Sequence, residues 1–285
     1  MADVRPTATV KPVTSVQAKK SANSISWLAP TLCILIGYII WRFLLGDASH
    51  FKTASGNGFW PDRDGATGSL YKMYQGGIIV PILIGCLLTV LTFVIERFLT
   101  IAKAGGTSSN ADFIRKVQYH LANKNVDAAL TECDKQKGSV GNVMKAGLHR
   151  YKDMMNNNEL STDQKVMAIQ KEVEEATSLE LPMLEKNLVF LSTIASVATL
   201  LGLLGTVMGM IRSFSALGED SGGGAAASKL SQGISEALYN TALGIGTSAL
   251  AIIFYNIFTT KIDGITYGID ESGFTLTQSF ASLYK

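Results

Sequence analysis

The chain is poor in charge and in cysteine. Only 17% of its 285 residues are Asp, Glu, Lys or Arg, whereas about a quarter are charged in an ordinary soluble protein. Of its cysteines, Cys33 and Cys86 fall inside long apolar stretches and Cys133 falls in a polar region. No cysteine pair therefore indicates a disulfide framework, which argues against a small disulfide-stabilised secreted domain.

Residue sets that carry common catalytic chemistry are also missing. The polar region between residues 96 and 187 contains His120 and His149, but no set of Cys, Asp and His stands near them at metal-ligand spacing. The sequence has no glycine-rich loop that could cradle a phosphate. We therefore expect no enzyme, no metal and no cofactor, and we interpret both histidines as surface residues.

Long apolar runs are what the sequence has instead. Hydrophobic residues make up 47% of the chain and gather in four runs, at 27–45, 77–95, 188–211 and 237–260. A helix of about 20 apolar residues crosses the hydrocarbon core of a bilayer, so each run can span it. Only Arg42 interrupts the runs, near an end, where its side chain can reach the headgroups. The sequence predicts an all-α, polytopic helical membrane protein.

The distribution of lysine and arginine predicts the orientation. Thirteen of these residues lie between 97 and 186 and four precede the first run, whereas 46–76 holds three and 212–232 holds two. Basic residues accumulate on the cytoplasmic side of a membrane. We expect both termini and the 96–187 region in the cytoplasm, with the other two loops outside.

These patterns predict nine segments. They are a disordered tail (1–26), a transmembrane helix (27–45), an outer loop (46–76), a second transmembrane helix (77–101), a cytoplasmic helical domain (102–187), a third transmembrane helix (188–211), an outer loop (212–232), a fourth transmembrane helix (233–260) and a cytoplasmic end (261–285). The first run could also be a signal peptide. It is longer than a typical apolar core and lacks a clear cleavage site, so we expect an uncleaved helix.

Within the cytoplasmic region a long helix is expected to begin at Ser161 or Thr162, either of which can cap it. Apolar residues spaced by three and four then continue into the third run, and Pro182 is expected to bend this helix. A helix that projects from the bilayer in this way suggests packing against copies of itself. A local helical hairpin within one subunit is the alternative.

The third run carries two adjoining stripes of small and polar residues. Gly202, Gly205 and Gly209 share one face, and small residues let helices approach closely in lipid, so we interpret this stripe as a packing seam. The neighbouring face carries hydroxyl side chains, namely Ser192, Ser196, Thr199 and Thr206. Hydroxyls in membrane helices commonly bond back to their own helix, so a structural role for these residues also stays open.

Glu236 heads the fourth run, which is otherwise uncharged. A carboxylate there costs a few kcal/mol unless it faces a bundle interior, a partner or an ion path, or reaches the headgroups. When the helix is wound at 100° per residue, Glu236 shares a sector of roughly 140° with Asn240, Thr241, Gly244, Thr247 and Ser248. Two neighbouring helices with such polar stripes favour the lining of an ion pathway.

The two runs together resemble a known family. The segments STIASVATLLGLLGTVMGMIRSF and GISEALYNTALGIGTSALAIIFYNIF are similar to the paired helices of the MotA/TolQ/ExbB proton channel family, closest to ExbB and next to TolQ. The likeness covers residues 180–262, with a weaker echo in VIERF after the second run. By this resemblance the pore threonines match Thr193 and Thr241, and the family glutamate matches Glu236. Weaker pore-lining candidates are Ser196, Thr199, Asn240, Thr247 and Ser248.

The resemblance implies a bacterial cytoplasmic (inner) membrane subunit. It would assemble as a homopentamer, among membrane lipids, around a single-helix partner similar to ExbD or TolR whose aspartate carries protons. The flux would drive a TonB-like energy transducer. The resemblance implies no nucleic acid among the binding partners. The family core has three crossings, so the first run is an added helix. The transported ion is expected to be H⁺, with Na⁺ as the alternative because Tyr239 and Asn240 stand beside Thr241.

Two other hypotheses for the function stay open. A TolQ-like role in envelope maintenance fits the same motifs. A membrane scaffold whose polar stripes bind other helices, without ion flux, is the structural alternative.

Overall fold

The computed structural model describes residues 23–55, 62–66, 68, 71–219 and 223–284. Within them, four helical stretches are long and apolar enough to cross a membrane. These stretches lie on α1 (Asn23–Ile39, continued by a π-helical segment over Ile40–Leu45), α3 (Ile79–Ala104), α8 (Leu188–Glu219) with the preceding α7 (Thr162–Glu185), and α9 (Gly223–Leu283). The predicted all-α polytopic fold is confirmed. Residues 1–22 of the expected disordered tail lie outside the described part of the chain.

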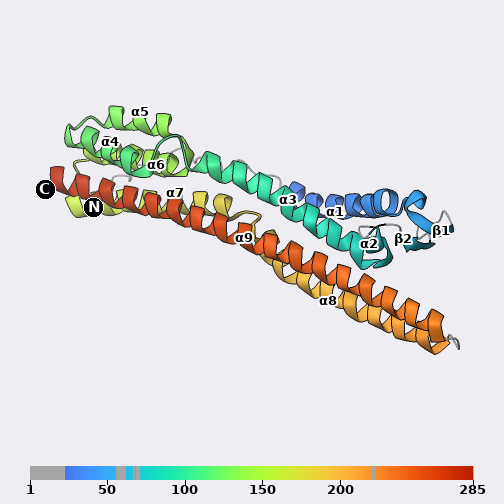
Figure 1. Ribbon diagram of the computed structural model, residues 1–285. Helices are drawn as coiled ribbons and strands as arrows, with labels where there is room; N and C mark the ends of the chain where they lie inside the picture. The colour runs from blue at the N-terminus through green and yellow to red at the C-terminus, as the bar shows by residue number, and fades with distance from the viewer. Residues whose placement is uncertain (1–22, 56–61, 67, 69–70, 220–222, 285) are drawn as a thin grey trace, which may run out of the picture.

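The molecule is an elongated bundle with short helices at one end (Figure 1). That end consists of α4 (Asn110–Ala122), α5 (Val126–Gln136) and α6 (Gly138–Met155), packed with α7 and the last part of α9. Tyr151 is buried here and meets the ring of Phe280 edge to face, with 4.8 Å between centroids. Aromatic pairs of this geometry add to the hydrophobic stabilisation of a core.

The segment between α1 and α3, expected to be a loop, contains an antiparallel hairpin. Strand β1 (Phe51–Ser55) pairs with β2 (Asp62–Ala66), and a short 3-10 helix (Ala48–His50) and α2 (Lys72–Gln75) flank the pair. Trp41 stacks on Tyr74 with 4.3 Å between ring centroids and donates its indole N–H to the Tyr74 carbonyl at 3.1 Å. This small aromatic core was not predicted, because the segment is rich in glycine and aspartate and was expected to be a loop.

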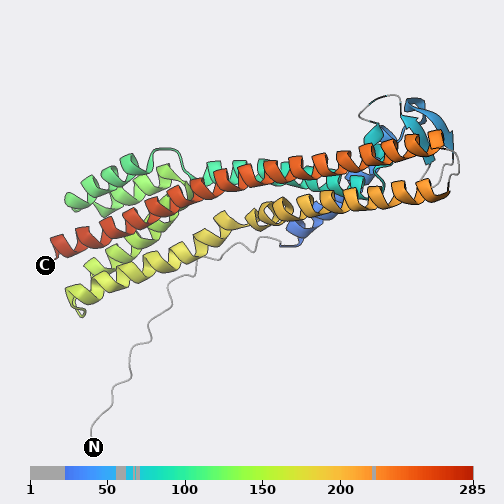
Figure 2. The ribbon, with the colours of Figure 1, turned by 60° about the horizontal axis from the view of Figure 1, so that its bottom comes forward.

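Helix α9 is much longer than a membrane is thick. At 1.5 Å per residue its 61 residues extend for about 90 Å, three times the hydrocarbon core. Figure 2 shows it running beside α8 and then beside α7 to the C-terminal end. The expected boundary at residue 260 is therefore no break in the helix. One rigid element joins the membrane part to the bundle of short helices.

The junction between α7 and α8 differs from the expected bend. The predicted cap is confirmed, because Ser161 and Gln164 form a reciprocal capping box at the start of α7. Pro182, however, lies inside α7, which continues to Glu185. The helix then breaks at Lys186 and Asn187, and Asn187 has a left-handed φ of 67°. The chain turns at Lys186 and Asn187, four and five residues beyond the proline.

A buried arginine explains where α7 stops. Arg97 on α3 is only 2% exposed, and its guanidinium donates to the carbonyls of Met183 at 3.4 Å and Leu184 at 3.2 Å. Cations near a helix C-terminus bind the carbonyls that lack partners there. Glu96 pairs with the same guanidinium and accepts a bond from the Asn187 amide at 3.3 Å. Two adjacent residues of α3 thus hold both sides of the break.

The cysteines are free, in agreement with the absence of a predicted disulfide framework. Cys133 is buried in the bundle of short helices, and desolvation is the main reason that its pKa rises to about 12. The thiolate is the reactive form of cysteine. Cys133 therefore stays protonated and unreactive at neutral pH.

Replacing Arg97 by Met should lower the free energy of unfolding by about 1–3 kcal/mol, because two helix carbonyls and Glu96 lose their donor. Thermal unfolding in detergent measures this change. The control is Arg115→Met, whose pair with Asp112 is exposed and contributes less than about 1 kcal/mol. Equal effects of the two substitutions would contradict the account of the α7–α8 junction.

Candidate functional site

The last two spanning helices, α8 and α9, meet along a seam of small residues. A β-carbon added at Gly205 would lie 2.6 Å from the Asn240 β-carbon, and one at Gly209 would lie 2.7 Å from that of Ala237. A β-carbon on Gly202 would contact the α9 backbone at 3.1 Å. The three glycines of the predicted seam thus face α9. No side chain fits between the helices at Gly205 and Gly209, so their backbones lie unusually close.

This close approach brings two threonine hydroxyls together. The Thr206 Oγ1 on α8 lies 2.9 Å from the Thr241 Oγ1 on α9. Thr241 is also 3.1 Å from the Gly202 carbonyl, and Thr206 is 2.8 Å from that of Leu203. The Thr206 hydroxyl also lies 3.4 Å from the Gly202 carbonyl. Each hydroxyl has a single proton, so two protons serve four contacts. The bonds can therefore rearrange without movement of the helices.

Glu236 lies on α9 five residues before Thr241, a rise of about 7.5 Å along the helix axis. It is half-buried and immediately precedes Ala237, which packs on Gly209. The carboxylate therefore belongs to the same helix pair as the two hydroxyls. It stands between them and the end of α9 where the helix begins.

Three other predicted residues lie inside the chain rather than on its surface. Asn240 is 2% exposed and donates its amide to the Gly76 carbonyl at 3.0 Å, which ties α9 to the turn before α3. Ser248 is buried and donates to the Ala195 carbonyl of α8. Among the described residues, the Asn240 Oδ1 and the Thr247 Oγ1 are buried without a hydrogen-bond partner. These side chains occupy the packed interior of one chain.

The remaining predicted residues lie on the outer surface of α8. Thr193, Ser196 and Thr199 are exposed. Thr193 precedes Thr206 by thirteen residues, about 20 Å along the helix. The structure therefore brings Thr241 to Thr206 and not to Thr193. The missed signal is that Thr206 follows Gly205 and comes four residues after Gly202, so it borders the seam.

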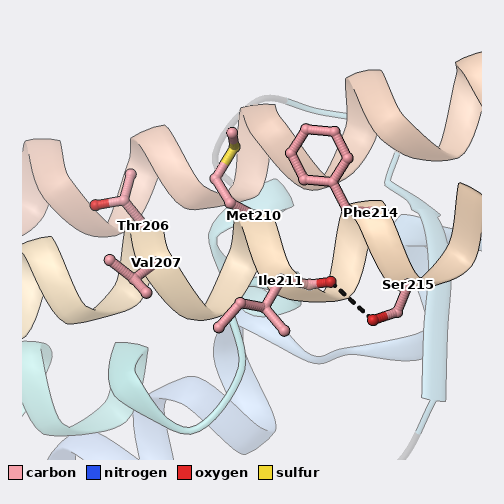
Figure 3. Close-up of a pocket in the computed structure, with 6 residues that line it drawn as sticks. All are labelled: Thr206, Val207, Met210, Ile211, Phe214 and Ser215. Atoms are coloured by element: carbon pink, nitrogen blue, oxygen red, sulfur yellow. Dashed lines mark hydrogen bonds between the residues drawn. The ribbon is translucent and has the colours of Figure 1, made fainter.

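Thr206 also borders a shallow hollow on the surface of α8. The hollow has a volume of about 620 Å³ and is lined by Thr206, Val207, Met210, Ile211, Phe214 and Ser215 (Figure 3). The Ser215 hydroxyl bonds back to the Ile211 carbonyl at 3.0 Å, so it is satisfied within its own helix. An apolar helix face thus extends from the hydroxyl pair towards the end of α8. No metal-binding group of His, Cys, Asp or Glu gathers in the described part of the chain.

These features define a multi-pass helical membrane protein whose last two spanning helices carry polar groups in a glycine seam. The sequence model of the MotA/TolQ/ExbB proton channel family matches residues 135–271. This match agrees with the resemblance seen in the sequences of the two helices. The matched region contains α7, α8, most of α9 and the threonine pair.

Three relatives are similar to part of the chain. The biopolymer transport protein ExbB-like 3 of Synechocystis sp. is 43% identical over 86 residues, which are 30% of this chain and 41% of the relative. The Tol-Pal system protein TolQ of Pseudomonas aeruginosa is 29% identical over 57% of this chain and 77% of the relative. TolQ of Haemophilus influenzae is 39% identical over 34% of this chain and 43% of the relative. The matched part spans less than half of two of these relatives.

Replacing Gly205 by Ala should lower the free energy of unfolding by about 1–3 kcal/mol, because the new methyl group meets the Asn240 β-carbon. The matched control is Gly246→Ala on α9, where an added β-carbon meets nothing within 4 Å. That change should be neutral or stabilise by up to about 1 kcal/mol. Thermal unfolding of both variants checks the seam, and a neutral Gly205→Ala would contradict it.

Proposed function

We propose that the chain is an ExbB-like subunit of an inner-membrane motor driven by protons. With a single-helix partner similar to ExbD, it would harness the proton motive force to energise TonB-dependent transport across the outer membrane. The observation that carries this proposal is the contact of 2.9 Å between the Thr206 and Thr241 hydroxyls in a seam of membrane helices. The family match over residues 135–271 supports it.

The proposed pathway uses hydroxyls whose bonds can be exchanged. In the low dielectric of a membrane, hydroxyl and carbonyl oxygens are the groups that can pass or orient a proton without a fixed charge. Thr206 and Thr241 provide two such oxygens beside the Gly202 carbonyl. Glu236, about 7.5 Å further along α9, would form the outer part of the route. The mobile proton would ride on an aspartate of the partner.

The partner's helix would lie against the exposed face of α8. That face carries Thr193, Ser196 and Thr199 towards one end and the apolar hollow beside Thr206 towards the other. A helix that is polar on an exposed face within a membrane requires a protein or water neighbour. Five copies of the chain around the partner, with α8 facing the centre, would enclose such a pathway.

A TolQ-like role is the second candidate. The Pseudomonas aeruginosa TolQ aligns over 179 residues and 77% of its own length, a longer alignment than that with the ExbB-like relative. The proposed proton pathway is the same in both roles. They differ in the process that receives the energy.

Complementation of a strain that lacks this chain tests the proposal. Thr206→Val and Thr241→Val should each lower ion-driven activity at least about tenfold, a loss of roughly 1.4 kcal/mol. Thr260→Val, the same change at an exposed hydroxyl of α9 that bonds back to the Asn256 carbonyl, should retain activity within about twofold. Uptake of a ferric siderophore reports the ExbB-like role, and resistance to detergent reports the TolQ-like role.

Assembly of each variant is measured in parallel by native gel electrophoresis. Normal assembly with lost activity in the Thr206 and Thr241 variants supports a pathway. Loss of assembly together with activity would favour the scaffold instead. A Thr260→Val variant as inactive as Thr206→Val would overturn the role of the hydroxyl pair.

A further inference from the structure

A second hollow lies between α3 and α9, away from the threonine pair. It has a volume of about 300 Å³ and is open on one side. Its floor is formed by Ile101, Phe258 and Ile265, which are 4%, 1% and 6% exposed. Phe98 forms a wall and is 61% exposed. The hollow therefore offers an apolar bed that the chain itself does not fill.

The hollow lies at the level where the apolar part of both helices ends. It includes Gly105, the residue that caps the C-terminus of α3, and Lys261, which follows the fourth apolar run. The short polar helices begin directly beyond it, with α4 at Asn110. The excess of basic residues on this side indicates the cytoplasmic face. The hollow is thus placed at the boundary between acyl chains and headgroups of the inner leaflet.

The charge at the rim is positive. The residues that line the hollow belong to the described part of the chain, and among them only Lys261 is charged. Phe258, Lys261 and Ile265 share a helix face because they are three and four residues apart. Asp263, the nearest carboxylate along α9, is turned by about 200° from Lys261 and faces away. An apolar bed with one cation at its headgroup end matches an anionic amphiphile.

We propose that this hollow binds an anionic phospholipid of the inner leaflet. One acyl chain lies on Phe98 and Phe258, and the phosphate pairs with the ammonium of Lys261. A lysine near an anionic membrane surface contributes about 1 kcal/mol, and its alkyl stem can lie along the apolar wall. The lipid would fasten α3 to α9 where both leave the membrane. This site is independent of the proposed proton pathway.

The test uses the full-length chain in nanodiscs that contain phosphatidylglycerol with a photoreactive group in its acyl chain. After illumination, mass spectrometry maps the modified peptides. We expect adducts in the segments around Phe98 and Phe258. Lys261→Glu should lower their yield at least about fivefold, the equivalent of 1 kcal/mol. The control Lys171→Glu, an exposed charge on α7, should leave the yield unchanged.

Two further arms identify the occupant. A photoreactive phosphatidylcholine should give a severalfold lower yield, and inorganic phosphate at millimolar concentration should not compete. Equal labelling by both lipids, an unchanged yield in Lys261→Glu, or competition by phosphate would each overturn the proposal. A photoreactive amino acid at position 98 tests for a second copy of the chain in the hollow. Cross-links from this position to another copy, in place of lipid, would also overturn the proposal.

Discussion

The close approach of α8 and α9 is the constraint on which the candidate site depends. Without side chains at Gly205 and Gly209, the two backbones come near enough for the Thr206 and Thr241 hydroxyls to meet. A β-carbon at either position would lie within 2.7 Å of a side-chain atom of α9, so a larger residue would push the helices apart and lengthen the contact between the hydroxyls. Because lipid is as apolar as leucine, packing of this kind rather than hydrophobic burial holds membrane helices together. The site's chemistry is thus a consequence of its packing.

The same helix pair is mechanically continuous with the bundle of short helices. Helix α9 passes without a break from the threonine pair to Leu276 and Phe280 in the buried core. Helix α8, in contrast, is separated from α7 by a break at Asn187 that Arg97 and Glu96 hold from α3. One helix of the pair is rigid along its length and the other is jointed.

The parts of the structure that follow from local pattern could be predicted. Hydropathy located the four apolar runs, and the spacing of Gly202, Gly205 and Gly209 located the seam. The register between two antiparallel helices is not encoded in either helix alone, and this is why the partner of Thr241 was missed. The helical wheel placed Thr206 with the other hydroxyls of α8, but the contacts of Gly205 with Asn240 and of Gly209 with Ala237 are what align it with Thr241.

Long-range contacts account for the other differences. Pro182 is a visible local signal for a bend, whereas the actual break depends on Arg97, 86 residues earlier in the chain. The hairpin of β1 and β2 stands beside Trp41 and Tyr74, which meet across 33 residues. The end of an apolar run likewise marks the edge of the membrane and not the end of a helix. Helix α9 continues beyond residue 260 because its following residues are buried against the short helices.

A disulfide cross-link tests the central claim most directly. In a chain whose native cysteines are replaced by alanine, Thr206→Cys with Thr241→Cys is oxidised, and a protease site placed between α8 and α9 is then cut. If the hydroxyls meet as described, the geometry suits a disulfide, and the two fragments should stay joined on a non-reducing gel. Thr193→Cys with Thr241→Cys should give separate fragments. Joined fragments in the second pair and separate fragments in the first would contradict the account.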